Sequence, residues 1–154
     1  VDDLISASGT YLYNGDYEIS NQEIPNDYDN VIFDQVVFIN GNLRISNDID
    51  IAPQSSALFV VSGNVEIDKN TDNVDVGIFA DGMFYTAYNV NEGEASRTLN
   101  LNGVYYADEF VFQRTLQGTN NDNDPSEKFT YEPKYTIQLR DFFGERHIVW
   151  VSVD

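Results

Sequence analysis

A glycine recurs five times along this chain, each time at the centre of a nine-residue segment with one shared pattern of apolar positions. The segments are YLYNGDYEI (11–19), VFINGNLRI (37–45), FVVSGNVEI (59–67), IFADGMFYT (78–86) and LNLNGVYYA (99–107). The positions two and four residues before the glycine, and two and four after it, are nearly all apolar. When the five segments are aligned on the glycine, each of these positions forms a column of mostly apolar residues. Such columns constrain the fold strongly, because the side chains of one column are expected to reach the same core.

The glycines are separated by 26, 22, 19 and 21 residues, and the residue directly before each one is polar. They are Gly15, Gly41, Gly63, Gly82 and Gly103. An Asn-Gly pair such as Asn40-Gly41 also signals a two-residue hairpin turn. That turn would place Ile39 opposite Asn42, and the apolar columns on the two sides of the glycine would then lie on opposite faces. A corner that keeps the period of two points all the columns inward, and glycine supplies the unusual backbone angles that such a corner needs.

A repeat of roughly 20 residues, built from strands and glycine corners, is typical of a parallel β-solenoid in which each repeat forms one coil. The ten Tyr and ten Phe residues, with many Val and Ile, favour strands over helices. We predict an all-β fold, a short parallel β-solenoid (right-handed β-helix) of about five coils with a C-terminal β-hairpin cap. The alternative is an antiparallel β-sandwich or jelly roll, whose inward columns would look similar.

The 154 residues form one domain of ordinary size. We expect an N-terminal flank (1–10), the solenoid coils (11–114), a polar loop (115–128) and a C-terminal cap (129–154). In the cap, Tyr135, Ile137 and Leu139 fall on one period-two track, which predicts a strand, and 141–146 (DFFGER) resembles the turn to a second strand. Such a hairpin would close one end of the solenoid.

The charge is strongly acidic, with 26 Asp and Glu against 8 Lys and Arg, a net charge of −18. Nucleic acid and anionic membrane surfaces repel such a chain, so neither is expected as a partner. No stretch of 18 apolar residues occurs, so we expect no membrane insertion by this segment. The charge is instead compatible with cation binding, with a basic partner, or simply with high solubility.

Two Asx-rich runs raise the question of calcium. Asp68, Asn70 and Asp72 reproduce the first three ligand positions of an EF-hand loop, and Asn120, Asp122 and Asp124 do the same. Neither run has the glycine at position six or the glutamate at position twelve that the loop requires. Because Asn and Asp also favour turns by bonding to nearby backbone, turn formation explains both runs. We therefore expect no cofactor, and calcium is the one ion that these residues leave open.

One outward surface has side chains suited to carbohydrate. Tyr85 and Tyr106 could stack on sugar rings, and Asp81 and Asp108 could form a carboxylate pair. Catalysis is not expected, because among 26 acidic residues some pair always lies close, and no Ser-His-Asp order, P-loop or zinc spacing occurs. The simpler interpretation is that these tyrosines cover the outer face of a sheet.

The stretch from Leu101 to Pro133 resembles the C-terminal, β-helical part of large uncharacterised surface or secreted proteins of candidate-phylum (Patescibacteria-like) bacteria. The shared features are the G-N-φ-x-I coils at 37–45 and 59–67, and the FQRTL step at 112–116, where φ is an apolar residue. An Asn/Asp-rich loop then precedes the spaced series Pro125, Glu127, Phe129, Tyr131, Pro133 and Tyr135. The resemblance covers about residues 31–154 and implies a cell-surface or extracellular location without implying a reaction.

We therefore expect a non-enzymatic extracellular structural module that serves as a stalk, a filament subunit or an adhesive tip. Its partners would be further copies, another surface protein or a glycan. Self-association would use the solenoid end left open, coil upon coil or by an inserted strand. Two alternatives remain: a carbohydrate-binding or carbohydrate-cleaving β-solenoid, and a calcium-dependent adhesion module.

Overall fold

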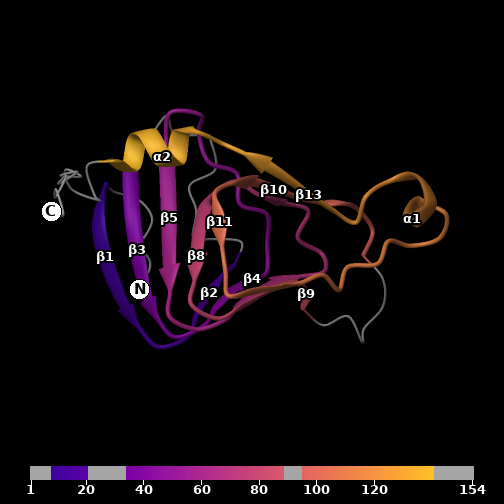
Figure 1. Ribbon diagram of the computed structural model, residues 1–154, viewed down its shortest axis with the longest axis horizontal. Coiled ribbons are helices and arrows are strands. Elements are labelled where there is room, and N and C mark those ends of the chain that lie inside the picture. Colours follow the sequence, from indigo (N-terminus) through magenta and orange to yellow (C-terminus); the bar gives the residue numbers. More distant parts are fainter. Residues whose placement is uncertain (1–7, 21–33, 89–94, 141–154) are drawn as a thin grey trace, which may run out of the picture.

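The computed structural model describes residues 8–20, 34–88 and 95–140. Nearly all of its regular structure is β-strand, and the strands wind into a β-solenoid of about four turns (Figure 1). Every strand pair in the described residues is parallel. The predicted parallel β-solenoid is thus confirmed, and the antiparallel sandwich is excluded.

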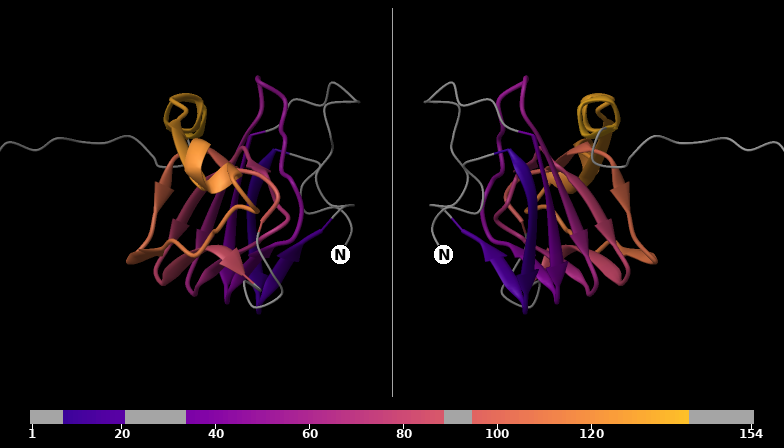
Figure 2. Two further views of the ribbon diagram at one scale, coloured as in Figure 1. Left: turned by 90° about the vertical axis from the view of Figure 1, so that its right-hand side faces the viewer. Right: turned by 90° about the vertical axis from the view of Figure 1, so that its left-hand side faces the viewer.

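Three parallel sheets form the sides of the solenoid (Figures 1 and 2). Sheet A contains β1 (Gly9–Asn14), β3 (Asp34–Asn40), β5 (Ser56–Val61), β8 (Gly77–Ala80) and β11 (Tyr105–Tyr106). Sheet B contains β2 (Tyr17–Ile19), β4 (Leu43–Ile45), β6 (Val65–Asp68), β9 (Met83–Tyr88) and β12 (Glu109–Val111). Sheet C contains β7 (Asn73–Val74), β10 (Leu99–Gly103) and β13 (Glu127–Tyr131). Within each sheet, neighbouring strands belong to successive coils.

The apolar columns of the first four repeats stack in register inside the solenoid. In sheet A, Ile39 lies beside Val61, and in sheet B, Leu43 lies beside Val65. All four side chains are buried. The alternation of the sequence therefore sets which face of each strand enters the core, as the period of two requires.

The corner glycines are required by close packing more than by unusual backbone angles, which corrects the sequence interpretation for the middle coils. Gly41, Gly63 and Gly82 do not have positive φ, unlike Gly15 in the first coil (φ +117°). A Cβ atom at Gly63 would lie 2.7 Å from the carbonyl oxygen of Gly41, and one at Gly82 would lie 2.8 Å from that of Gly63. The preceding coil therefore leaves no space for a side chain at these corners.

The fifth repeat lies at a different corner from the other four, so its assignment to the same column was wrong. Residues Leu99–Gly103 form β10 in sheet C, and Gly103 precedes the strand of sheet A. The residue that stacks on Gly82 is instead Asp108, whose backbone N–H donates to the Gly82 carbonyl oxygen at 3.1 Å. A strand that ends in glycine gives the same apolar pattern at either corner, so the pattern does not distinguish them.

Two short helices follow the coils. α1 (Asn120–Asn123) lies in the polar loop, and α2 (Lys134–Gln138) follows β13. The strand expected over 135–139 is therefore wrong. In a helix Tyr135 and Leu139 share one face and are buried, whereas Ile137 is 66% exposed.

The described part of the segment expected to form a hairpin cap, 129–154, does not form a hairpin. β13 is a strand of sheet C that pairs with β10, and α2 then turns back along the solenoid and contacts β5 (Figure 1). The described part of this segment thus runs along the side of the solenoid and does not cover its last coil. Residues 141–154, which include the expected turn and second strand, lie outside the described residues.

Candidate functional site

The predicted carbohydrate surface is divided by a corner of the solenoid. Asp81 and Asp108 lie in successive coils at the corner between sheets A and B. Tyr106 projects outward from sheet A, where its ring meets Phe79 edge-on with 6.3 Å between centroids. Tyr85 belongs to sheet B, and its hydroxyl donates to the sulfur of Met83 at 3.0 Å. The two tyrosines therefore face outward from different sheets.

The first predicted calcium run forms a hydrogen-bonded turn. The Asp68 Oδ1 atom accepts from the backbone N–H of Asn70 at 2.8 Å and from its side-chain amide at 2.9 Å. Asp72 is directed away from this turn and pairs with two arginines, as described below. The side chains of Asp68, Asn70 and Asp72 therefore do not converge on a single point where a calcium ion could bind.

The second predicted calcium run forms α1 and the residue after it. The backbone N–H of Asp124 donates to the Asn120 carbonyl oxygen at 2.9 Å, and the Asp122 side chain is exposed. Within the ranges that the structure describes, no group of three or more His, Asp or Glu residues is placed to hold a metal ion.

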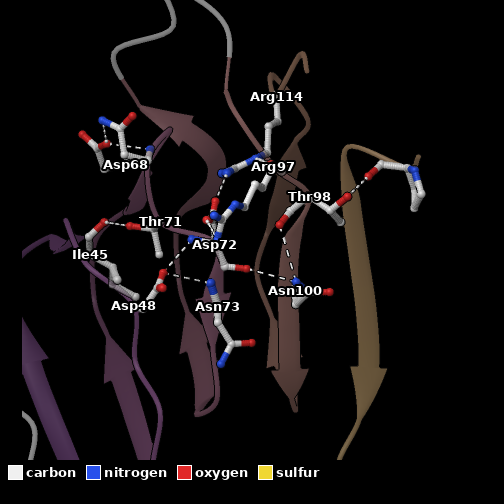
Figure 3. A network of polar contacts seen from close by, with 12 residues as sticks. Ile45, Asp48, Asp68, Thr71, Asp72, Asn73, Arg97, Thr98, Asn100 and Arg114 are labelled. Carbon is white, nitrogen blue, oxygen red and sulfur yellow. Dashed lines mark hydrogen bonds and ion pairs between the residues drawn. The ribbon is translucent and has the colours of Figure 1, made fainter. Parts of the chain in front are cut away.

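Asp72 is the centre of a polar network that the sequence did not predict (Figure 3). Its Oδ1 atom lies 3.3 Å from Nη2 of Arg114, and its Oδ2 atom lies 3.6 Å from Nη1 of Arg97. The Arg114 side chain is fully buried, and its Nε–H donates to the Arg97 carbonyl oxygen at 3.0 Å. The network therefore joins the turn before β7 to the segments before β10 and after β12.

Burial and neighbouring charges act in opposite directions on this network. Burial, and then the nearby Asp48 carboxylate, raise the pKa of Asp72, while Arg114 and Arg97 lower it. Burial also lowers the pKa of Arg114, and the Asp72 carboxylate opposes that change. Asp48 is held in turn, because its Oδ1 atom accepts from the backbone N–H groups of Asp72 at 2.6 Å and Asn73 at 3.0 Å. Both carboxylate oxygens of Asp72 are occupied by guanidinium groups, so its role is structural.

A hollow of about 560 Å³ opens beside this network. Its lining is mostly carboxylate, amide, hydroxyl and guanidinium groups: Asp48, Asp72, Asn73, Ser96, Arg97, Thr98, Asn100, Leu116, Asn120 and Asp124. Such a lining can bind a polar ligand through hydrogen bonds. Asn120 and Asp124 thus come from one predicted calcium run and Asp72 from the other, and the fold brings them to a common hollow.

The last coil presents a second feature, which we call the aromatic end face: Phe110, Phe112 and Phe129. These residues continue the inward columns of the solenoid, and no further coil of the described chain covers them. Leu101 is 0% exposed beneath Phe129, whereas Phe129 itself is 43% exposed. Phe112, two residues after the inward Phe110, is 61% exposed.

The rings of the end face contact one another. Phe110 lies 6.3 Å from Phe112 and 5.8 Å from Phe129, measured between ring centroids, and Phe112 lies 6.1 Å from Phe129. Around them, β11, β12 and β13 are each the terminal strand of a sheet, so their outer backbone groups have no strand partner among the described residues. In the part of the chain that the structure describes, the core of the solenoid is thus open at this end.

Comparison with known proteins gives no family for the chain. No family model matches it, and no curated protein or solved structure is significantly similar to it. None of the described helices is long and apolar enough to cross a membrane. Function is therefore argued from the geometry of the hollow and of the aromatic end face.

Proposed function

We propose that this chain is a non-enzymatic structural module of the cell exterior, a stalk, filament subunit or adhesive tip, that associates through its open solenoid end. The aromatic end face carries the proposal. The outer edges of β11, β12 and β13 surround it and are ready to accept further parallel or antiparallel strands. The partner is a further copy of the chain or another surface protein.

The physical driving force is the burial of core side chains that now face water. Covering one Phe side chain completely stabilises a complex by about 1.5–3 kcal/mol, and Phe112 and Phe129 are respectively 61% and 43% exposed. A strand added to each sheet would also pair backbone groups that water now solvates. The surface location is supported by the sequence resemblance described above and by the strongly acidic composition.

Light scattering and negative-stain microscopy over a concentration series test this proposal. We expect wild-type particles to grow with concentration, whereas Phe112→Lys, which places a charge in the end face, stays small. The substitution lowers the net negative charge, so greater repulsion between copies cannot explain a loss of association. Ile137→Lys is the matched control, since Ile137 on α2 is 66% exposed and Phe112 61% exposed. A wild-type chain that scatters as a 17.5 kDa monomer at every concentration, and binds no surface protein through this end, would contradict the proposal.

The polar hollow supports a second candidate function, binding of a glycan. Arg97 is the exposed guanidinium of its lining, with 77% of its side chain accessible, and it can donate to sugar hydroxyl groups. A glycan array and calorimetry with the wild-type chain would identify a ligand. Arg97→Ala should then abolish binding, and Arg44→Ala, which alters an ion-paired arginine of sheet B, should not. Equal binding by both variants would exclude the hollow.

A further inference from the structure

The outer face of sheet A carries a continuous apolar row, which we call the sheet A stripe. It takes one outward side chain from each strand of the sheet: Leu12, Phe38, Val60, Phe79 and Tyr106. The register pairs each residue with the next, so the five form one line along the solenoid. Leu12 is 68% exposed, Phe38 41% and Tyr106 64%. Val60 and Phe79 pack partly against the hydrophobic core cluster, whereas Leu12, Phe38 and Tyr106 lie outside it.

The columns beside the stripe are uncharged in β1, β3 and β5. On the side toward sheet B they hold Asn14, Asn40 and Ser62, and on the other side Thr10, Val36 and Leu58. Val36 and Leu58 point outward by alternation but are buried, and α2 lies across this end of β3 and β5 (Figure 1). Beside Phe79 and Tyr106 the column toward sheet B instead holds Asp81 and Asp108, so in this chain of net charge −18 the neutral border covers the first three strands of the stripe.

We propose that the sheet A stripe is a lateral interface between two copies of this chain. A second copy fits for two reasons. Two chains of charge −18 can approach most closely where few ionised groups lie, and the part of the stripe on β1, β3 and β5 has none in the columns beside it. In addition, a row of side chains spaced by the distance of about 4.8 Å between strands matches another row with the same spacing. A basic partner would gain charge pairing only at the end of the row that Asp81 and Asp108 border.

Two identical stripes pack through a twofold axis, which closes the assembly as a dimer. Val60 is the central residue of the stripe, so it faces the Val60 of the other copy whether the axis runs along the strands or along the solenoid. This interface rests on the proposed self-association but uses a different surface from the aromatic end face. Lateral pairing and end-to-end pairing together would produce a two-column filament.

Analytical ultracentrifugation in the Phe112→Lys background separates the two surfaces, because end-to-end contacts are already removed there. We expect this variant to form a dimer of twice the 17.5 kDa chain. Adding Phe38→Lys should give a monomer that melts at the same temperature as the Phe112→Lys chain does when it is diluted until it too is monomeric. Adding Met83→Lys should leave the dimer intact, since Met83 lies on sheet B and is 39% exposed, close to the 41% of Phe38.

Each other outcome overturns the lateral interface and leaves the end face to be judged by its own test. A Phe112→Lys chain that is already monomeric shows that the stripe does not pair copies. If the Phe38→Lys monomer melts below the diluted, monomeric Phe112→Lys chain, another part of the same chain covers the stripe. Equal loss of the dimer with Phe38→Lys and Met83→Lys shows an effect of charge alone.

Crosslinking gives an independent readout, because the chain contains no cysteine. Facing sheets pack about 10 Å apart, so a bis-maleimide reagent of that span should join two copies carrying Val60→Cys. Met83→Cys should give no crosslinked dimer under the same conditions. Absence of a Val60→Cys dimer, or equal crosslinking at both positions, would contradict the proposed interface.

Discussion

At the corner between sheets A and B, contacts with the preceding coil determine which residue fits at each position. The corner glycines fit against the carbonyl oxygen of the glycine one coil earlier, and the residue after each glycine forms a ladder of its own. Asp16 Oδ1 accepts from the Asn42 backbone N–H at 2.8 Å, and Asn42 and Asn64 continue the ladder to Met83 at 2.8 and 2.9 Å. This exposed ladder satisfies backbone N–H groups at a turn where strand pairing stops.

Substitution of a corner glycine tests this close packing. Gly63→Ala places a Cβ atom against the Gly41 carbonyl oxygen, 2.7 Å away, so the coils must separate locally. We expect the free energy of unfolding to fall by about 1–3 kcal/mol. Gly118→Ala is the comparison, because nothing lies within 4 Å of its Cβ and only its φ of +60° opposes a side chain. Urea titrations in which Gly63→Ala costs no more than Gly118→Ala would contradict the packing explanation.

A buried glutamine offers a second test at the residue scale. Gln35 in β3 is fully buried, and neither polar atom of its side chain has a hydrogen-bond partner in the part of the chain that the structure describes. An unsatisfied buried amide costs about 1–3 kcal/mol. Gln35→Met, which keeps the length of the side chain, should therefore raise the free energy of unfolding by about 1 kcal/mol. A lower melting temperature for this variant would show that the amide is bonded after all.

Among the elements, α2 depends on specific contacts with coils that precede it by many residues. The Tyr135 hydroxyl donates to the Asp75 backbone carbonyl at 2.5 Å and approaches its Oδ1 atom at 2.7 Å. Lys134 pairs with the Oδ2 atom of the same Asp75 at 3.4 Å, and the Gln138 amide donates to the Gln54 carbonyl oxygen at 3.2 Å. A helix of five residues is unstable alone, so these contacts and the burial of Tyr135 determine its position.

Tyr135→Phe tests how strongly α2 is held. The substitution removes the single hydroxyl proton of Tyr135, which the Asp75 carbonyl and carboxylate oxygens share, and it should lower the free energy of unfolding by about 1–3 kcal/mol at neutral pH. Burial, followed by the Asp75 hydrogen bond, raises the pKa of Tyr135 far above its usual value. The protonated hydroxyl therefore stabilises the fold below about pH 10, the pKa of an unfolded tyrosine, and this stability is lost as pH rises further.

Equilibrium unfolding measured at neutral pH and above about pH 10 checks both parts. The wild-type chain should lose stability with rising pH more steeply than Tyr135→Phe. Some slope should remain in the variant, because burial also raises the pKa of Tyr105. Identical slopes would mean that α2 is already detached when tyrosine ionises.

At the scale of the whole molecule, apolar surfaces compete with a net charge of −18. The aromatic end face and the sheet A stripe favour association. Repulsion between the acidic surfaces of two copies opposes it, and added salt shortens the range of that repulsion. Raising the salt concentration from roughly 0.01 M to 1 M shortens the Debye length from about 30 Å to about 3 Å. We therefore expect association of the wild-type chain to increase with salt, as measured by sedimentation velocity.

The same measurement separates general screening from a calcium site. At equal ionic strength, calcium chloride and sodium chloride should give the same oligomer distribution and melting temperature if screening alone acts. A higher melting temperature with calcium, reversed by chelator, would instead support the calcium-dependent adhesion module. Association that weakens as salt increases would show that charge pairing, and not apolar contact, joins the copies.

The candidate surfaces differ in how far the sequence could predict them. Asp72 was singled out as a possible calcium ligand, but its main partner Arg114 lies 42 residues further along the chain. No local spacing reveals such a pair, because it depends on how two coils and a loop are stacked. The exposure of Phe112 is also not visible in the sequence, because it depends on which of the described segments stack over the last coil.

Sequence alone determined the parallel solenoid, its inward columns and the corners at Gly15, Gly41, Gly63 and Gly82. These features follow from alternation and spacing, which are local and are repeated by every coil. Tertiary structure decided that Gly103 lies at another corner, that 134–138 is a helix, and that the sheet A stripe forms a single line. Each of these depends on register between segments far apart in the chain, because the same apolar pattern fits more than one corner and a short segment takes the structure that its contacts stabilise.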